Sequence, residues 1–405
     1  MGTAPEEVIR VTESVRRVVT DSVEMHDFFM GTHSPHDSVA TPPAQTAPGP
    51  SRGGSRRGGS GHGGSGHGGS GHGIVLDEED LRLLHALQIA PRASWAELGR
   101  LLGMAPSTAA RRWVRLEESG AAWVSCQPID DPDTSIGVLE VSCRAGSALT
   151  AATTLAADAA AMTIDIASGS RDLLVTVTQP DQLALSDYLL ERVGRIPEVE
   201  SVRSHVVARR YTDASRWRLR SLSKRQEAAI GAAAQTAIHP GAVGPLDRRL
   251  VELLSTDGRR PVADLAERLD VSESTVRRRL QALSASGSLR LRCEVARDLT
   301  EWRVLEWFFL RVPPDRMDEA GQALAGIPEL RTALSTAGPT NLIAAAWLRT
   351  VTDGQRLEAR LRQQMPWLEF VDRSVVLRPV KLVGRLLDPR GFAVGTVPLG
   401  AGRSA

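Results

Sequence analysis

Two stretches of this chain follow one pattern, and they decide the fold. Residues 94–120 read SWAELGRLLGMAPSTAARRWVRLEESG, and residues 261–287 read PVADLAERLDVSESTVRRRLQALSASG. Each stretch shows leucines at helical spacing, a short turn, and a second helical pattern that begins with Ser-Thr and carries adjacent arginines. A helix, a tight turn and a second helix in this order predict a helix-turn-helix domain, whose second helix enters the major groove of DNA.

The repeat extends over whole domains. The two stretches match at an offset of 167, whereas LDEEDLRLL at 76–84 matches LDRRLVELL at 246–254 at an offset of 170. This difference predicts that the second copy has lost three residues around STDGRR. Farther along, GSRDLLVTV at 169–177 matches GPTNLIAAA at 338–346, at an offset of 169. The chain is therefore interpreted as a tandem duplication of one long unit.

The second part of each unit alternates strand-like and helical patterns. In the first unit, strands are expected at 137–143, 162–167, 173–178 and 199–208, with helices at 147–160 and 181–195. The order βαββαβ predicts a ferredoxin-like domain, and the second unit repeats it between 304 and 377. We predict an α+β protein of two tandem units, each a winged-type helix-turn-helix domain followed by a ferredoxin-like βαββαβ domain.

The N-terminal region differs in composition from the rest of the chain. It becomes rich in Pro, Gly, Ser and Arg and ends in SGHGGSGHGGSGHG, which buries too little apolar surface to offset the backbone entropy of folding. The expected domains are a disordered Gly/Ser/His-rich tail at 1–73, helix-turn-helix domains at 74–126 and 246–293, ferredoxin-like domains at 135–211 and 300–385, a linker at 212–245 and a C-terminal tail at 386–405.

Whole-chain composition points to a cytoplasmic protein. The 49 basic and 48 acidic residues nearly cancel, so any affinity for nucleic acid must arise locally. Cys126, Cys143 and Cys293 lack the close spacing of a zinc site or a disulfide framework. No apolar run is long enough for a membrane span. Evenly spaced histidines in the tail are interpreted as part of a solvated linker, and no metal or other cofactor is expected.

The arginine-bearing helices carry the predicted DNA contacts. Ser272 is a good N-cap candidate in the second copy, whereas Ala105 in the first copy has no capping group. The second helical domain has ten basic and seven acidic residues and the first has six and seven, so the second should dominate affinity for phosphate. The residues predicted to contact DNA are Ser107, Thr108, Arg111, Arg112, Arg115, Ser274, Thr275, Arg277, Arg278, Arg279 and Gln281.

Two of these arginines have a second interpretation. Arg112 and Arg279 flank the apolar stripe of their helices, so either an ion pair within the domain or a phosphate contact is consistent with their positions. The sequence alone leaves this choice open.

The repeated sequence resembles the Lrp/AsnC family of bacterial and archaeal regulators. The resemblance rests on LDEEDLRLLHALQIAPRASWAELGRLLGMAPSTAARRWVRLEESG, on its partner at 246–287, and on the βαββαβ pattern after each. It covers about residues 74–211 and 246–385. It implies a regulator that binds double-stranded DNA and assembles as a homo-oligomer through its α+β domains, with an amino acid or related small molecule as effector.

The family also places a Gly-x-x-Asp turn between the second and third strands. The first unit keeps it at 169–172, while the second has Asn341 in place of the aspartate. A tight turn that requires positive φ is the simpler interpretation of the two glycines. The effector-binding residues that the resemblance implies are Gly169, Arg171, Asp172, Gly338, Thr340 and Asn341.

The family normally pairs two helix-turn-helix domains by dimerisation, so the tandem chain is interpreted as a covalent pseudo-dimer.

Two other hypotheses remain beside a non-enzymatic regulator. Siroheme decarboxylases are also similar to this family and would need proton donors such as histidine in a pocket. His85 and His205 are the only histidines within the two repeated units. The third hypothesis is an interaction protein that no longer binds DNA.

Overall fold

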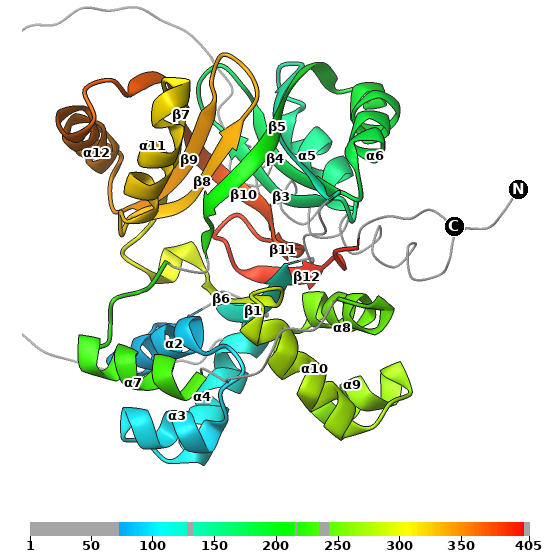
Figure 1. Ribbon diagram of the computed structural model, residues 1–405, viewed down its shortest axis with the longest axis vertical. Coiled ribbons are helices and arrows are strands. Elements are labelled where there is room, and N and C mark those ends of the chain that lie inside the picture. The colour runs from blue at the N-terminus through cyan, green and yellow to red at the C-terminus, as the bar shows by residue number, and fades with distance from the viewer. Residues whose placement is uncertain (1–72, 128–132, 215–216, 235–242, 401–405) are drawn as a thin grey trace, which may run out of the picture. The chain divides into compact units, whose positions relative to one another are not determined.

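The computed structural model describes residues 73–127, 133–214, 217–234 and 243–400 (Figure 1). It is a mixed helix and strand protein, as expected. The predicted disordered tail, apart from its last residue, lies outside the described residues.

Each helix-turn-helix domain contains three helices with matching bounds. In the first domain they are α2 (Glu78–Ile89), α3 (Trp95–Leu102) and α4 (Pro106–Glu118). In the second they are α8 (Pro245–Thr256), α9 (Val262–Leu269) and α10 (Glu273–Ala285). All three pairs of helices correspond at one offset of 167.

This constant offset shows that the predicted loss of three residues was wrong. Asp77, of the first Leu-Asp pair, is the N-cap of α2, whereas Asp247 of the second pair is the third residue of α8 and corresponds to Asp80. Packing sets the correspondence, because the buried leucines Leu83 and Leu250 occupy equivalent positions at the offset of 167. The matching Leu-Asp letters were therefore misaligned by three residues, which is nearly one helical turn.

A single strand follows each helix-turn-helix domain, and the two strands pair with each other. β1 (Ala122–Gln127) and β6 (Arg290–Val295) form an antiparallel two-stranded sheet. A winged-type domain would supply both strands of its hairpin itself. In the part of the chain that the structure describes, the partner strand comes instead from the other unit, so this pairing joins the two helix-turn-helix domains.

Two equivalent arginines make reciprocal contacts between the same domains. Arg92 donates hydrogen bonds to the backbone carbonyls of Gly258 (2.6 Å) and Arg260 (2.9 Å). Arg259 donates to the carbonyls of Pro91 and, at 3.0 Å, Ala93. Each arginine thus holds the turn that carries the other, as a two-fold related pair would.

The α+β part of each unit has the predicted order of elements. The first unit contains β2 (Ser135–Cys143), α5 (Ala148–Ala156), β3 (Ala161–Ala167), β4 (Leu173–Gln179), α6 (Gln182–Asp187), which continues as irregular helix to Arg195, and β5 (Val199–Thr212). The second contains β7 (Val304–Arg311), α11 (Met317–Ala325), β8 (Leu330–Thr336), β9 (Leu342–Leu348), α12 (Val351–Gln364) and β10 (Glu369–Leu382).

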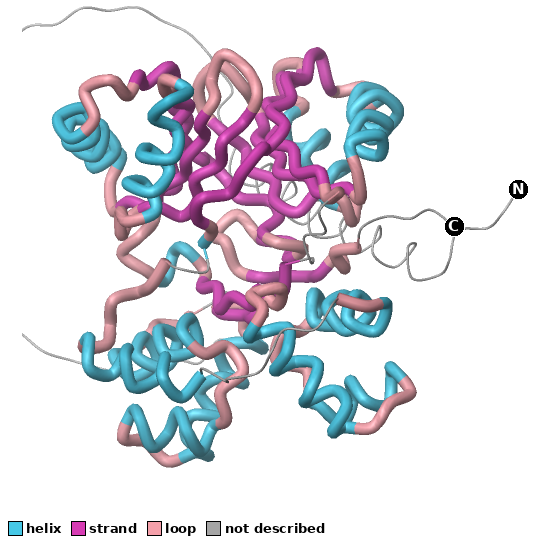
Figure 2. The backbone as a smooth tube through the Cα atoms, in the orientation of Figure 1, coloured by secondary structure: helices cyan, strands magenta, loops and turns pink. Residues whose placement is uncertain are grey.

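The strands of the two units form one closed sheet and not two separate ferredoxin-like sheets. Their order is β3-β4-β2-β5-β8-β9-β7-β10, and β10 pairs again with β3. Strand β5 of the first unit pairs with β8 of the second, and β10 pairs with β3, so each unit covers both edges of the other. Figure 2 shows these strands gathered together, with helices on the outside.

The closed sheet separates three apolar cores. Inside the ring, Val138 and Leu174 of the first unit pack with Phe309 and Ile343 of the second. On the outside, α5 and α6 cover the first unit's strands, and α11 and α12 cover the second unit's strands. The inner core therefore contains side chains from both copies.

The expected linker and C-terminal tail are partly folded. The linker contains α7 (Lys224–Ala234), whose Ile230 is buried in the first helix-turn-helix core together with Leu219 and Leu222. Past residue 385, β11 (Arg385–Leu387) and β12 (Ala393–Thr396) form a hairpin, and Phe392 is fully buried in the same core. Apolar side chains spaced through both segments supply the burial that the sequence interpretation overlooked.

Among the described residues, no helix is long and apolar enough to cross a membrane.

We predict that Arg259→Ala lowers the free energy of unfolding by about 1 to 3 kcal/mol, since it leaves two backbone carbonyls without their donor. Arg259 also stacks over Trp95, 4.0 Å from the ring centroid. Urea titration measures the change. Arg268→Ala is the matched control, because Arg268 lies on the neighbouring helix and pairs only with the partly exposed Asp264. Equal effects of the two substitutions would contradict the reciprocal contact.

Candidate nucleic-acid interface

Local sequence explains how α4 and α10 begin. Gly103 and Asp270 end the preceding helices in the left-handed region, at φ of 74° and 54°. Ser272 caps α10 by accepting a hydrogen bond from the backbone N–H of Thr275, which confirms the predicted cap. Ala105 gives α4 no side-chain cap, as expected, and Pro106 occupies its first turn. The second copy therefore has the better capped helix.

Each helix buries one apolar face and leaves the opposite face outside. Trp113 and Leu116 of α4 are buried, as are Leu280 and Leu283 of α10. These residues belong to the apolar stripe of each helix that Arg112 and Arg279 flank in the sequence. The predicted contact residues consequently lie on or beside the outer face, but they differ in what they already bind.

Arg112 and Arg279 are held by carboxylates of their own domains. Arg112 donates to Asp80 (2.8 Å) and to Asp77, and Arg279 donates to Asp247 (2.6 Å) through Nε. Asp80 and Asp247 are buried and lie 32 residues before the arginine that each binds. The ion-pair interpretation therefore holds for both arginines. The identical spacing is the sequence signal that could have identified these carboxylates.

Two further predicted arginines also have acidic neighbours. Arg115 pairs with Asp80 at 2.5 Å, and Arg277 pairs with Glu273 at 2.5 Å, one helical turn away. Both guanidinium groups remain about half exposed, at 46% and 59%. The Arg277–Glu273 pair is exposed on both sides, so it contributes little to stability and Arg277 can exchange its carboxylate for a phosphate. Arg115 instead pairs with the buried carboxylate of Asp80, which Arg112 also binds.

Arg111 and Arg278 are equivalent, exposed and unpaired. At the offset of 167 they occupy the same position of α4 and α10, and neither makes a hydrogen bond or ion pair with any residue that the structure describes. A guanidinium on the outer face of such a helix can bind a phosphate or the edge of a guanine. These two arginines are the most available cations of the predicted set.

The remaining predicted contacts surround the N-terminal turns. Ser107 is exposed and Thr108 half-buried in the first copy. In the second copy, the hydroxyls of Ser274 and Thr275 lie 2.9 and 3.0 Å from that of Ser272. Gln281 is exposed.

The outer faces of the two helices are chemically unequal. Where α10 carries Arg277 and Gln281, the equivalent positions of α4 carry Ala110 and Val114, and Val114 is 46% exposed. The second helix can therefore offer more hydrogen-bond donors to DNA. The dominance of the second domain in affinity for DNA stays a prediction.

The turns predicted to bind an effector have structural partners. Gly169 and Gly338 adopt φ of 94° and 137°, which supports the tight-turn interpretation. A carboxylate oxygen of Asp172 accepts a hydrogen bond from the backbone N–H of Cys143 (2.7 Å), and the Asn341 side chain binds both backbone groups of Val312 (2.8 Å each). Asn341 therefore makes the same kind of side-chain to backbone hydrogen bond in the second unit that Asp172 makes in the first.

Arg171 and Thr340 occupy equivalent positions in these turns, and both are buried. Arg171 lies inside the joint sheet, where its Nε donates to Glu140 at 2.5 Å and its guanidinium covers the ring of Phe309 at 4.0 Å. His205 also bonds to Glu140, at 2.6 Å. Burial alone would raise the pKa of Glu140, but the hydrogen bonds from His205 and Arg171 hold it below its ordinary value.

His85 is a buried connector in the first helix-turn-helix domain. Its Nδ1 accepts hydrogen bonds from the backbone N–H groups of Ser221 and Leu222, both at 3.0 Å. Its Nε2 lies 3.4 Å from a carboxylate oxygen of Glu227. Burial, assisted by the charge of Arg218, lowers the pKa of His85 to about 4. The imidazole is therefore neutral at pH 7, and it ties α2 to the segment that connects the two units.

Comparison with known proteins supports the duplicated domain. The family model for the AsnC-type helix-turn-helix domain matches twice, at residues 76–117 and 245–284. An uncharacterised HTH-type transcriptional regulator of Pyrococcus furiosus is 27% identical over 148 residues, which cover 35% of this chain and 96% of the relative. A similar regulator of Pyrococcus abyssi is 26% identical over 142 residues, 34% of this chain and 88% of the relative.

One solved structure aligns over a much larger share of the chain. The siroheme decarboxylase NirDL, in complex with an iron-uroporphyrin III analogue, is 16% identical and has a TM-score of 0.50. The alignment covers 78% of this chain and 95% of that chain. At this level of identity the likeness shows the fold alone.

We predict that stability falls as the pH drops below 6.5, because the His85 pKa is lower in the folded chain than in the unfolded one. Between pH 7 and pH 5 the His85 imidazole becomes protonated in the unfolded state but stays neutral in the folded state. This difference lowers the free energy of unfolding by roughly 2 kcal/mol at pH 5. Urea titrations between pH 7 and pH 5 measure the slope. His85→Gln should flatten it, and an unchanged slope in that variant would contradict the assignment.

Proposed function

Because the chain is a tandem-duplicated member of the Lrp/AsnC family, we propose that it is a transcriptional regulator that binds specific double-stranded DNA with α4 and α10 together. The observation that carries the proposal is the paired arrangement of arginines in both copies. Arg112 and Arg279 anchor the helices to their own domains. The residue before each of them, Arg111 or Arg278, is exposed and free to contact DNA.

The two DNA-binding domains act as a fixed pair. The β1–β6 pairing and the reciprocal contacts of Arg92 and Arg259 join them within one chain. Helix-turn-helix dimers bind half-sites about 10 base pairs apart. A fixed intramolecular pair should likewise require one spacing of half-sites, and covalent linkage removes the concentration dependence of dimer formation.

The half-sites should differ in sequence and in strength. The outer face of α10 presents Arg277, Arg278 and Gln281, whereas α4 presents Ala110, Arg111 and Val114 at the same positions. Amide and guanidinium groups form directional hydrogen bonds with base edges, and valine offers only apolar contact. We expect the second domain to set most of the affinity and the first to add a weaker preference.

Effector binding and assembly remain predictions. An amino-acid-like effector at the turns of Gly169 and Gly338 would have to compete with the backbone hydrogen bonds of Asp172 and Asn341. Homo-oligomers through the α+β domains would have to use their outer helices, since the strand edges of one unit are paired with the other unit. Cytoplasmic location is expected of a DNA-binding regulator.

An enzyme of the siroheme decarboxylase type is the alternative function, and the joint two-unit fold is the observation that favours it. Both histidines of the repeats already make hydrogen bonds within the protein: His85 binds backbone N–H groups, and His205 binds Glu140. Adding siroheme to the purified protein and recording the Soret band tests the alternative. A saturable spectral shift with loss of carboxylate groups from the tetrapyrrole would favour the enzyme.

We predict that Arg278→Ala and Arg279→Ala separate DNA binding from folding. Arg278→Ala should weaken specific DNA binding by about 1 to 3 kcal/mol, roughly 5- to 150-fold, without changing stability. Arg279→Ala leaves the buried carboxylate of Asp247 without its partner and should lower the free energy of unfolding. Fluorescence anisotropy with DNA selected from a random pool measures affinity, and urea titration measures stability.

Arg111→Ala should weaken the same complex less than Arg278→Ala. Arg195→Ala is the control, because Arg195 is exposed and lies in the α+β part of the first unit. Salt-sensitive, sequence-selective binding by the unsubstituted protein is required. Its absence, or an Arg278→Ala variant that binds as well as the control, would refute the proposed function.

A further inference from the structure

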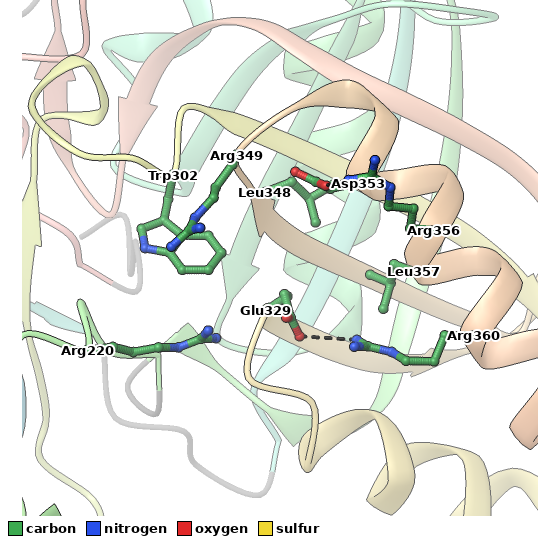
Figure 3. A pocket seen from close by; sticks show the side chains of 9 residues that line it. All are labelled: Arg220, Trp302, Glu329, Leu348, Arg349, Asp353, Arg356, Leu357 and Arg360. Carbon is green, nitrogen blue, oxygen red and sulfur yellow. Dashed lines mark hydrogen bonds and ion pairs between the residues drawn. The ribbon is translucent and has the colours of Figure 1, made fainter.

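A pocket of about 420 Å³ opens beside α12 (Figure 3). Four arginines line it, two from α12, one from the end of β9 and one from the segment between the two units. Leu348, Leu357 and the ring of Trp302 add apolar surface, and all three residues are nearly buried. The four arginines are Arg220, Arg349, Arg356 and Arg360.

Three of these arginines are already paired with carboxylates. Arg360 binds Glu329 at 3.2 Å and Arg356 binds Asp353 at 3.0 Å, and both carboxylates also line the pocket. Arg349 binds Glu301 at 2.7 Å. These pairs are at the surface and therefore weak, so a competing anion can displace a carboxylate from them at small cost.

Arg220 is the cation that remains without an acidic partner. It is exposed and makes no hydrogen bond or ion pair among the residues that the structure describes. Its guanidinium lies 4.7 Å from the centroid of the Trp302 ring, and that of Arg349 lies 5.1 Å from the same ring.

The backbone of Arg220 has a φ of 63°, a strained value for a residue with a side chain. Strain of this kind concentrates at ligand-binding sites.

The first unit does not share this pocket chemistry. At the offset of 169, which relates β4 to β9 and the N-cap Asp181 to Thr350, the counterparts of Arg349, Arg356 and Arg360 are Pro180, Asp187 and Glu191. The three positions thus carry three positive charges in the second unit, whereas in the first unit one is uncharged and two are negative. The arginines are a property of the second copy and not a requirement of the fold.

We propose that this pocket binds a small organic anion, a carboxylate attached to an apolar body. Guanidinium groups bind carboxylates in a planar, bidentate geometry. Arg220 and Arg349 would take the carboxylate, and Leu348, Leu357 and the edge of Trp302 would contact the apolar part. Inorganic phosphate has no apolar part and should bind more weakly.

Arg220 also connects the pocket to the first DNA-binding domain. The residues on either side of it are hydrogen-bonded to α2: the backbone N–H of Leu219 donates to Gln88 (2.8 Å), and those of Ser221 and Leu222 donate to His85. A ligand that holds Arg220 would therefore stiffen the segment that secures α2. Any effect of this on DNA rests on the proposed function, whereas ligand binding itself does not.

Isothermal titration calorimetry with the full chain tests the site, using 4-phenylbutyrate, its neutral amide and inorganic phosphate as probes. We expect saturable binding of 4-phenylbutyrate, at least tenfold weaker binding of the amide and of phosphate, and a loss of roughly tenfold or more in Arg220→Gln and in Arg349→Gln. Arg195→Gln, on the equivalent helical segment of the first unit, is the control and should bind normally.

Hydrogen exchange gives a second measurement that needs no DNA. The probe should slow exchange in residues 217–222 in the unsubstituted protein and leave it unchanged in Arg220→Gln. The proposal is overturned if 4-phenylbutyrate does not saturate, if phosphate binds more tightly, or if the two arginine variants bind like the control. These results do not depend on DNA, so failure of the DNA-binding function would be seen separately.

Discussion

Unpaired strand edges are the constraint on which the rest of this structure depends. Each unit folds a four-stranded antiparallel sheet, and the outer strands of such a sheet expose backbone groups that require partners. Here the second unit's β8 and β10 pair with the first unit's β5 and β3, so the ring closes without a free edge among its eight strands. Neither α+β part is complete alone. The same reciprocity continues in β1 and β6, which place the two helix-turn-helix domains side by side.

The two copies agree where the fold needs them and differ where ligands would bind. Asp80 with Arg112 and Asp247 with Arg279 are the same buried anchor, and Asp172 and Asn341 close the same strand with different groups. Buried or hydrogen-bonded positions tolerate few substitutions, because an unpaired polar group there is costly.

Exposed positions carry no such cost, so the copies have diverged there in chemistry and in charge. The valine of α4 corresponds to the glutamine of α10, and Pro180 corresponds to Arg349. A symmetric dimer of separate chains could not carry these differences, since each substitution would appear in both subunits. Duplication within one chain therefore allows one DNA-binding helix to be stronger and one pocket to be cationic.

Much of the fold was accessible from the sequence, because helical and strand periodicity are local patterns. The helix-turn-helix domains, the Ser272 cap and the order βαββαβ were predicted correctly. The joint ring was not, since strand pairing between units depends on edges that leave no local mark. The alignment of the two Leu-Asp pairs gave a wrong offset between the first helices of the two copies. The correct offset follows from the buried positions of Leu83 and Leu250. On the outer faces of α4 and α10 the arginines could be placed from the sequence, but the division between anchoring and free ones required the positions of Asp80 and Asp247.

The central claim is that one chain presents two joined but unequal DNA-binding domains. The most direct measurement is the ratio of chains to half-sites in the complex, by native mass spectrometry with excess of a selected duplex. We expect one 43.6 kDa chain for every two half-sites, with one half-site protected more strongly in a footprint of the same complex. One chain for each half-site, with equal protection, would contradict the account.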